Sequence, residues 1–132
     1  MIYLCGGFKG NWQQRVIDAV PNGTFFNPKD HKEVMKPEVY TKINKDGLDQ
    51  CDVVFAYLEK DNPSPMNVPL ECGYMLGRGG RVIFCNEWRV GDEERPWFKQ
   101  RFIDMFINIV TYHTTDFNDG INKLREWTNH NA

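Results

Sequence analysis

The chain has 132 residues, a length that fits one domain, and 41% of them are hydrophobic, which is enough to form a core. Its 18 acidic residues nearly balance its 16 basic ones, so composition excludes the strongly basic footprint of a nucleic-acid-binding protein. The sequence opens on an apolar, strand-like run and has no long apolar segment. We therefore expect a cytoplasmic protein with neither a nucleic-acid polymer nor a membrane as its partner.

Short apolar runs alternate with segments of helical periodicity along the chain. The runs at residues 2–5, 53–58 and 82–85 are continuous rather than alternating, as in parallel strands that helices cover on both faces. Residues 24–26 and 108–112 are the two further strands that we expect.

Helical periodicity and capping residues predict five helices between and after these strands. The first three are expected at residues 11–20, at residues 38–50, and from about residue 67 to the Gly79-Gly80 pair. The fourth is marked by an apolar stripe of Phe98, Phe102, Met105 and Phe106. The fifth follows a capping-box-like pair, Asp116 and Asp119, and carries Phe117, Ile121 and Leu124.

This alternation of strands and helices predicts a single α/β domain over residues 1–132, a three-layer fold with a five-stranded parallel sheet between helices. Long polar loops, at residues 27–37, 59–69 and 88–96, follow three of the expected strands. Ligands bind outside the carboxyl ends of the strands in such sheets, so the site is expected among these loops.

The cysteines are scattered and form no CxxC pair, so their spacing indicates neither a metal site nor a redox motif. Three of the four lie within or beside apolar runs, where a free cysteine behaves as a small buried hydrophobe. We therefore expect reduced structural thiols at all four positions, which are Cys5, Cys51, Cys72 and Cys85.

A glycine-rich turn, Cys-Gly-Gly-Phe-Lys-Gly at residues 5–10, joins the first strand to the first helix. It matches neither GxGxxG nor GxxxxGK[ST], so neither familiar nucleotide phosphate cradle is indicated. The turn offers backbone N–H groups near a helix N-terminus, with Phe8 and Trp12 as stacking partners. A ligand contact and a plain tight turn are both compatible with this pattern.

Glu71 stands near the start of the third expected helix. Asn67 is a suitable N-cap and Pro69 fits the first turn, where its missing N–H is not needed. Glu71 then lies beside the positive end of the helix dipole, which favours an ionised carboxylate. Gly73 and Gly77, four residues apart, would let this helix approach the sheet or a neighbouring subunit closely.

A carboxylate at this edge of the sheet suits the cleavage of a glycosidic bond. Such cleavage passes through an oxocarbenium-like transition state, which a carboxylate stabilises or bonds to covalently. Tyr3, in the first strand, could hold Glu71 in place by hydrogen bonding. From position alone, it is at least as plausible that Glu71 has no catalytic role and simply stands at the start of a helix.

Several motifs occur in order between residues 2 and 77. The chain reads Ile-Tyr-Leu-Cys-Gly-Gly at residues 2–7, Gly-Asn-Trp-Gln at residues 10–13 and Phe-Asn-Pro at residues 26–28. GLDQCDVVFAY follows at residues 47–57 and NVPLECGYMLG at residues 67–77. Together these motifs resemble the nucleoside 2-deoxyribosyltransferase family, and beyond Glu87 the resemblance fades.

The resemblance implies a flavodoxin-like sheet, a homo-oligomer with sites completed across subunits, and no metal or cofactor. It also implies a ping-pong transferase acting on small-molecule nucleosides and nucleobases. The deoxyribosyl group would pass to Glu71, the catalytic nucleophile, and a second base would then take the sugar.

The resemblance also implies roles for other residues. Tyr3 would orient the nucleophile, Gly6 and Phe8 would line the base pocket, and Asn67 would contact a sugar hydroxyl. Asp30 is a further expected substrate contact.

The acid that assists the departing base is not fixed by these motifs. The family often has an aspartate eight residues before the position of Asp52, where this chain has Asn44. Asp46, two residues further on, is the candidate catalytic acid. The other acidic residues in or near the loops are Asp30, Asp49 and Asp61.

Two other functions remain open. A hydrolase of the same fold would act on nucleosides or their 5'-monophosphates, with Lys9, Arg78 or Arg89 as candidate phosphate ligands. A nucleotide-sensing or receiver-like module would catalyse nothing. A receiver needs paired acidic residues at the end of the first strand, and Cys-Gly-Gly at residues 5–7 supplies none.

Overall fold

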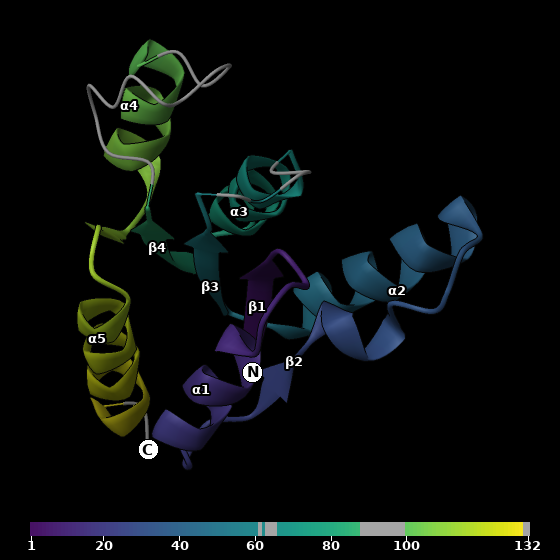
Figure 1. Ribbon diagram of the computed structural model, residues 1–132, viewed down its shortest axis with the longest axis horizontal. Helices are drawn as coiled ribbons and strands as arrows, with labels where there is room; N and C mark the ends of the chain where they lie inside the picture. The colour runs from purple at the N-terminus through teal and green to yellow at the C-terminus, as the bar shows by residue number, and fades with distance from the viewer. Residues whose placement is uncertain (61, 63–65, 88–99, 131–132) are drawn as a thin grey trace.

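The computed structural model describes residues 1–60, 62, 66–87 and 100–130 (Figure 1). In chain order the elements are β1 Ile2–Gly6, α1 Trp12–Ala19, β2 Phe25–Phe26, the 3-10 helix η1 Pro28–His31, α2 Pro37–Gln50, β3 Val53–Leu58, α3 Asn67–Gly77, β4 Arg81–Asn86, α4 Gln100–Ile109, β5 Tyr112–Thr114 and α5 Phe117–His130.

The sheet has five parallel strands in the order β2-β1-β3-β4-β5, which confirms the expected α/β fold of flavodoxin-like topology. Ile2 in β1 is opposite Phe25 on one side and Val53 on the other. The chain builds outward from β1 to β2, then returns past β1 to place β3 on its other side. The junction of β1 and β3 is therefore the topological switch point, where ligands bind in folds of this kind.

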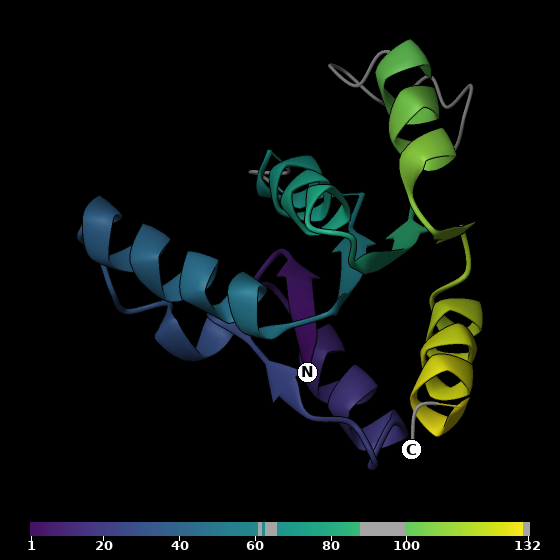
Figure 2. The same ribbon diagram turned by 180° about the vertical axis from the view of Figure 1, so that it is seen from behind.

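Helices cover both faces of the sheet, as Figures 1 and 2 show: α1 and α5 on one face, and α2, α3 and α4 on the other. Alternate strand residues point to opposite faces, so each strand supplies both cores. Leu4, Phe55 and Ile83 pack with α1 and α5. Tyr3 and Val54 pack on the opposite face, which α2, α3 and α4 cover.

The C-terminal third differs from the expected pattern. The strand expected at residues 108–112 is shifted: α4 runs to Ile109 and β5 begins only at Tyr112. Ile103, Phe106 and Val110 pack on the core at helical spacing, and this apolar face extends the helix into the expected strand. Met105 is 64% exposed rather than part of that stripe, and Phe98 lies outside the described residues.

The fifth helix begins where expected but is capped differently. The Asp116 carboxylate accepts a 2.9 Å hydrogen bond from the Asn118 N–H. Asp119 does not close a capping box, because the Asp116 N–H donates a 3.0 Å bond to Thr114 Oγ1; the Asp119 carboxylate accepts a 2.6 Å bond from the Tyr112 hydroxyl. The cap of α5 is thus also tied to the edge strand β5.

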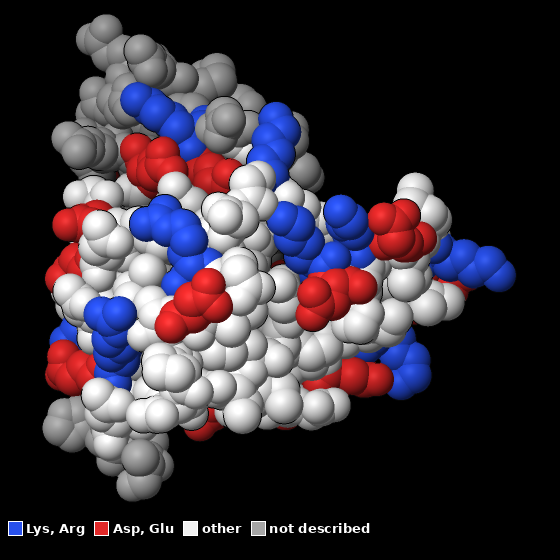
Figure 3. All heavy atoms as spheres, turned by 60° about the horizontal axis from the view of Figure 1, so that its bottom comes forward, with Lys and Arg blue, Asp and Glu red and all other residues white. Residues whose placement is uncertain are grey.

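Acidic and basic side chains are interspersed on the face drawn in Figure 3, in keeping with the near balance of charge. Within the described ranges, no helix has the length and apolar character needed to cross a membrane. The same ranges bring together no group of three His, Cys, Asp or Glu side chains that could hold a metal. All four cysteines are buried and free.

Candidate active site

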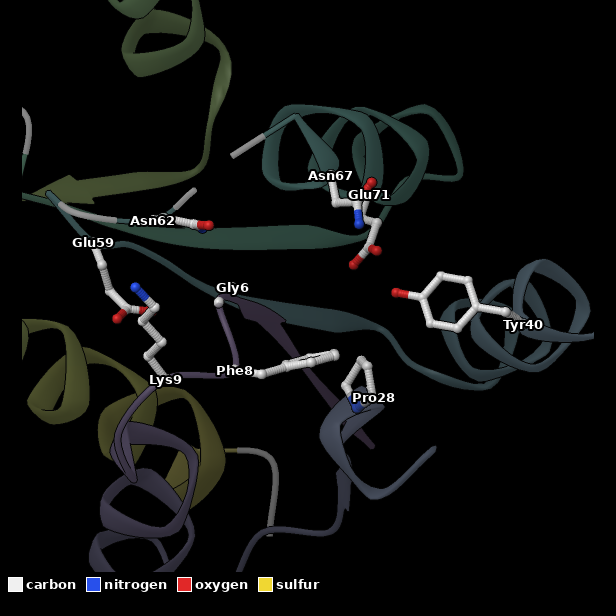
Figure 4. A pocket seen from close by; sticks show the side chains of 10 residues that line it. Gly6, Phe8, Lys9, Pro28, Tyr40, Glu59, Asn62, Asn67 and Glu71 are labelled. Atoms are coloured by element: carbon white, nitrogen blue, oxygen red, sulfur yellow. The ribbon is translucent and has the colours of Figure 1, made fainter. Parts of the chain in front are cut away.

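A cavity of about 360 Å³ opens at the carboxyl ends of β1 and β3, the switch point of the sheet (Figure 4). We call it the switch-point cavity. Loops after three strands and the helices α2 and α3 contribute to its walls. The lining residues are Gly6, Gly7, Phe8, Lys9, Pro28, Tyr40, Glu59, Asn62, Asn67 and Glu71.

The glycine-rich turn is both a tight turn and a cavity wall. A Cβ on Gly6 would lie 2.6 Å from the carbonyl oxygen of Tyr57, so only glycine lets β1 end this close to β3. Trp12 Nε1 and Gln13 Nε2 each donate a 2.9 Å hydrogen bond to the Gly7 carbonyl. These bonds fasten the turn to α1 and give the Trp-Gln pair a structural role.

The start of α3 differs in detail from the expected cap. Met66 has helical dihedral angles and occupies the N-cap position, so Asn67 is already the first helical residue and makes no side-chain cap bond. Its side chain lines the switch-point cavity instead. Pro69 still falls in the first turn, and Glu71 is one turn in from the start of the helix.

Burial decides the ionisation of Glu71. Removal from water raises the pKa of Glu71 to about 7, opposed by hydrogen bonding from Tyr3 and Cys5, which favours the charged form. The expected stabilisation of the carboxylate at the helix start is therefore outweighed by desolvation. A carboxyl group with this pKa is divided between its acid and ionised forms at neutral pH.

Tyr3, in β1, is a neighbour of Glu71. It is fully buried, and its ring stacks on Phe26 with centroids 5.3 Å apart. Burial and the neighbouring Glu71 raise the pKa of Tyr3 above its usual range, so the hydroxyl remains a neutral donor. Among the described residues its oxygen has no partner at full hydrogen-bond geometry.

Cys5 is a neighbour of Glu71 that the sequence interpretation treated as purely structural. Hydrogen bonding with Cys72, burial and the nearby Glu71 raise the pKa of Cys5 well above its usual value, so its thiol stays protonated. The thiol donates a 3.9 Å hydrogen bond to the Val68 carbonyl oxygen, and its hydrogen bonding also favours the charged form of Glu71. Period-two spacing places residues 3 and 5 on the same face of β1, and this spacing could have revealed the contact.

Of the candidate acid partners, the three within the described residues, Asp30, Asp46 and Asp49, do not line the switch-point cavity. The Asp46 carboxylate lies on α2, half exposed, 2.8 Å from Lys42 Nζ. Asp30 is exposed on η1, although its neighbour Pro28 lines the cavity. Asp49 pairs with Lys45 and accepts a bond from Tyr74. Asp61 lies outside the described residues, as does the loop expected at residues 88–96.

A second cavity of about 280 Å³ lies between α2 and α3, and we call it the α2–α3 cavity. Its walls are mostly apolar, and buried Asn44 belongs to them. Tyr40, Asn67 and Glu71 line both cavities. The two cavities therefore adjoin at these three residues.

Comparison with known protein families places this site in context. The family model described as "Nucleoside 2-deoxyribosyltransferase like" matches residues 1–88. The chain belongs to the nucleoside 2-deoxyribosyltransferase-like family. The matched stretch holds β1 to β4 and every residue that lines the switch-point cavity.

A solved structure with the same fold is the crystal structure of a conserved protein from Enterococcus faecalis V583. Its TM-score is 0.70 at 11% sequence identity, over 96% of this chain and 97% of that one. At this identity the likeness shows the fold alone, and it extends that fold beyond the segment matched by the family model. A comparison with curated proteins gave no match.

Proposed function

We propose that this member of the nucleoside 2-deoxyribosyltransferase-like family transfers the deoxyribosyl group of a 2'-deoxyribonucleoside to a second nucleobase, with Glu71 as nucleophile. The observation that carries the proposal is the position of Glu71: a partly buried carboxyl group at the switch point, next to two neutral donors. A carboxylate at the anomeric carbon can stabilise the oxocarbenium-like transition state of N-glycosidic cleavage or bond to the sugar covalently.

The proposed reaction has two displacements at C1' of the sugar. The Glu71 carboxylate attacks C1', the C1'–N bond breaks, and its electron pair leaves with the base, which takes up a proton. A nitrogen of the second base then attacks C1', the ester bond to Glu71 breaks, and the new base loses its proton. The carboxylate is regenerated, and no oxidant or reductant is involved.

The walls of the cavity suit the parts of such a substrate. Phe8 and Pro28 present apolar surfaces below Glu71, where a flat base can stack (Figure 4). Tyr3 and Cys5 orient the carboxylate from β1. The Asn67 amide, at the start of α3, offers a donor and an acceptor for a sugar hydroxyl.

A hydrolase is the second candidate, with water in place of the second base. The observation in its favour is Lys9, which lines the end of the cavity opposite Tyr40 and Glu71 (Figure 4). A lysine at the far end of the cavity from Glu71 can attract the 5'-phosphate of a bound nucleotide. The substrate of this alternative would then be a nucleoside 5'-monophosphate.

We further propose that the chain forms a homo-oligomer through the surface around the α2–α3 cavity. Leu70 lines this cavity and is 70% exposed, and Met66 at the start of α3 is 61% exposed. A second copy of the chain would cover these apolar side chains. Sedimentation analysis should show a dimer or larger species that Leu70→Glu dissociates. A wild-type monomer at high concentration would contradict this proposal.

Product analysis tests the proposed function. The chain is incubated with deoxyinosine and free adenine or cytosine, and products are separated by chromatography. A new deoxynucleoside supports transfer, and free hypoxanthine without exchange supports hydrolysis. Glu71→Gln should abolish either reaction, whereas Glu126→Gln, at an exposed ion pair with Lys123 on α5, should not. No reaction with any of several nucleosides or their 5'-monophosphates would overturn both proposals.

A further inference from the structure

Tyr40 stands across the cavity from the strand that carries Tyr3. It belongs to α2, is half-buried, and lines both the switch-point cavity and the α2–α3 cavity. Figure 4 shows its hydroxyl directed toward the carboxyl group of Glu71. Glu71 is thus approached by tyrosines from two directions, one in the sheet and one in a helix.

Asn44 accompanies Tyr40 on the same face of α2. The two are four residues apart, a spacing that makes side chains neighbours on a helix. Asn44 is only 6% exposed, and among the described residues neither its amide nitrogen nor its amide oxygen has a partner at full geometry. Hydrogen bonding with Asn44 lowers the pKa of Tyr40, against the larger raising effects of burial and Glu71. The Asn44 amide is therefore next to the Tyr40 oxygen.

The packing of α2 brings this pair close to the strand. A Cβ on Gly47 would lie 2.5 Å from the ring of Phe26, and the same ring stacks on Tyr3. The absence of a side chain at Gly47 thus lets α2 approach the β1–β2 layer. The same close approach sets the reach of Tyr40 toward Glu71.

We propose that Tyr40 is a positioning residue for Glu71, with Asn44 fixing the direction of the Tyr40 hydroxyl. In this arrangement the Asn44 side-chain N–H donates to the Tyr40 oxygen, and the Tyr40 O–H donates to the Glu71 carboxylate from α2. A carboxylate held from two sides keeps one orientation toward C1' of the sugar. The inference rests on the proposed role of Glu71 as nucleophile.

The experiment measures the ionisation of Glu71 directly, by carbon NMR titration of its side-chain carboxyl group in the intact chain. The variants are Tyr40→Phe and Asn44→Leu, with Tyr112→Phe as the matched control. Tyr112 also donates to a carboxylate, Asp119, but on β5 at the far edge of the sheet.

Several other titratable and charged groups surround Glu71. They are Tyr3 and Cys5 from β1, Tyr40 and Lys45 from α2, Cys72 and Tyr74 from α3, and Lys9 and Glu59 in the cavity walls.

Loss of a donor to the ionised form should raise the pKa of Glu71 by about half a unit or more in Tyr40→Phe, and by a smaller amount in Asn44→Leu. With a nucleoside that the wild type turns over, kcat should fall about tenfold or more in Tyr40→Phe while KM changes by less than about threefold. Tyr112→Phe should match the wild type in both measurements.

A Tyr40→Phe chain that titrates and reacts as the wild type does would overturn the inference. Reduced kcat with an unchanged Glu71 titration would also overturn it, because that result indicates a structural defect. Failure of the proposed function is distinguishable: the wild type would then be inactive with every nucleoside. A raised Glu71 pKa in Tyr40→Phe would still support the Tyr40–Glu71 contact in that case.

Discussion

The buried Tyr3 hydroxyl is a neighbour of the Glu71 carboxyl group: Glu71 helps to raise the pKa of Tyr3, and hydrogen bonding from Tyr3 lowers the pKa of Glu71. The tyrosine comes from the first strand and the glutamate from α3. Because α3 packs on the face of the sheet to which Tyr3 points, the fold brings the two together, and Glu71 also lines the switch-point cavity. The ionisation of the proposed nucleophile therefore depends on the packing of the sheet against α3.

The pH dependence of activity should report the ionisation of Glu71. Since only the carboxylate can attack C1', kcat/KM should rise with pH through the pKa of Glu71, about 7. Tyr3→Phe removes a donor to the charged form, so the acid limb should move to higher pH and the rate at pH 7 should fall about tenfold. An acid limb near pH 4, or one that Tyr3→Phe leaves in place, would contradict this prediction.

Glu71 should also lower stability at alkaline pH. Its pKa is about 7 in the folded chain against an ordinary 4.5, so the folded state keeps a proton that the unfolded state loses as pH rises between these values. Stability from this group is therefore lost as pH rises. Glu71→Gln should be about 1–3 kcal/mol more stable than the wild type at pH 8 and about equal to it at pH 5. Denaturant unfolding at both pH values measures this, and an equal difference at both would refute it.

Two helical glycines should respond in opposite directions to alanine. Gly47→Ala would place a methyl group 2.5 Å from the Phe26 ring, which Tyr3 holds by stacking. We expect a loss of about 1–3 kcal/mol, larger than the gain of about 1 kcal/mol from helix propensity. Gly73 on α3 is exposed, with no described atom within 4 Å of a Cβ, so Gly73→Ala should gain stability in the monomer. Thermal unfolding of the two variants side by side decides this.

The variant Asp46→Asn tests whether Asp46, the candidate acid from the sequence, assists the departing base. Asp46 pairs with Lys42 on α2 and lines neither cavity. Loss of an exposed i,i+4 pair changes the free energy of unfolding by less than about 1 kcal/mol. Because Asp46 lines neither cavity, kcat should also stay within about twofold of the wild type. A fall of a hundredfold would restore Asp46 as the catalytic acid.

The order of the elements could be predicted from the sequence because buried parallel strands leave uninterrupted apolar runs. The bounds of β3 are those expected from the sequence. The observed β1 is longer than its apolar run by Gly6, and β4 is longer by Arg81 and Asn86. The shift of β5 could not be foreseen, since Phe106 and Val110 are as compatible with a strand as with a helix. Only packing against the core distinguishes the two.

The candidate site was predicted unevenly for a related reason. Four of the expected site residues belong to continuous sequence motifs and line the switch-point cavity: Gly6, Phe8, Asn67 and Glu71. Tyr40 and Cys5 become neighbours of Glu71 only through the register of β1 and the closeness of α2. Nor does sequence show that desolvation at Glu71 outweighs its place at a helix start.

The most direct test is mass spectrometry of the chain quenched with acid during turnover of a 2'-deoxyribonucleoside. If Glu71 is the nucleophile, the peptide that contains it should gain the mass of one deoxyribosyl group, and the same peptide from Glu71→Gln should not. Fragmentation should place the added mass on residue 71. An unmodified peptide during measurable turnover, together with an active Glu71→Gln variant, would contradict the central claim.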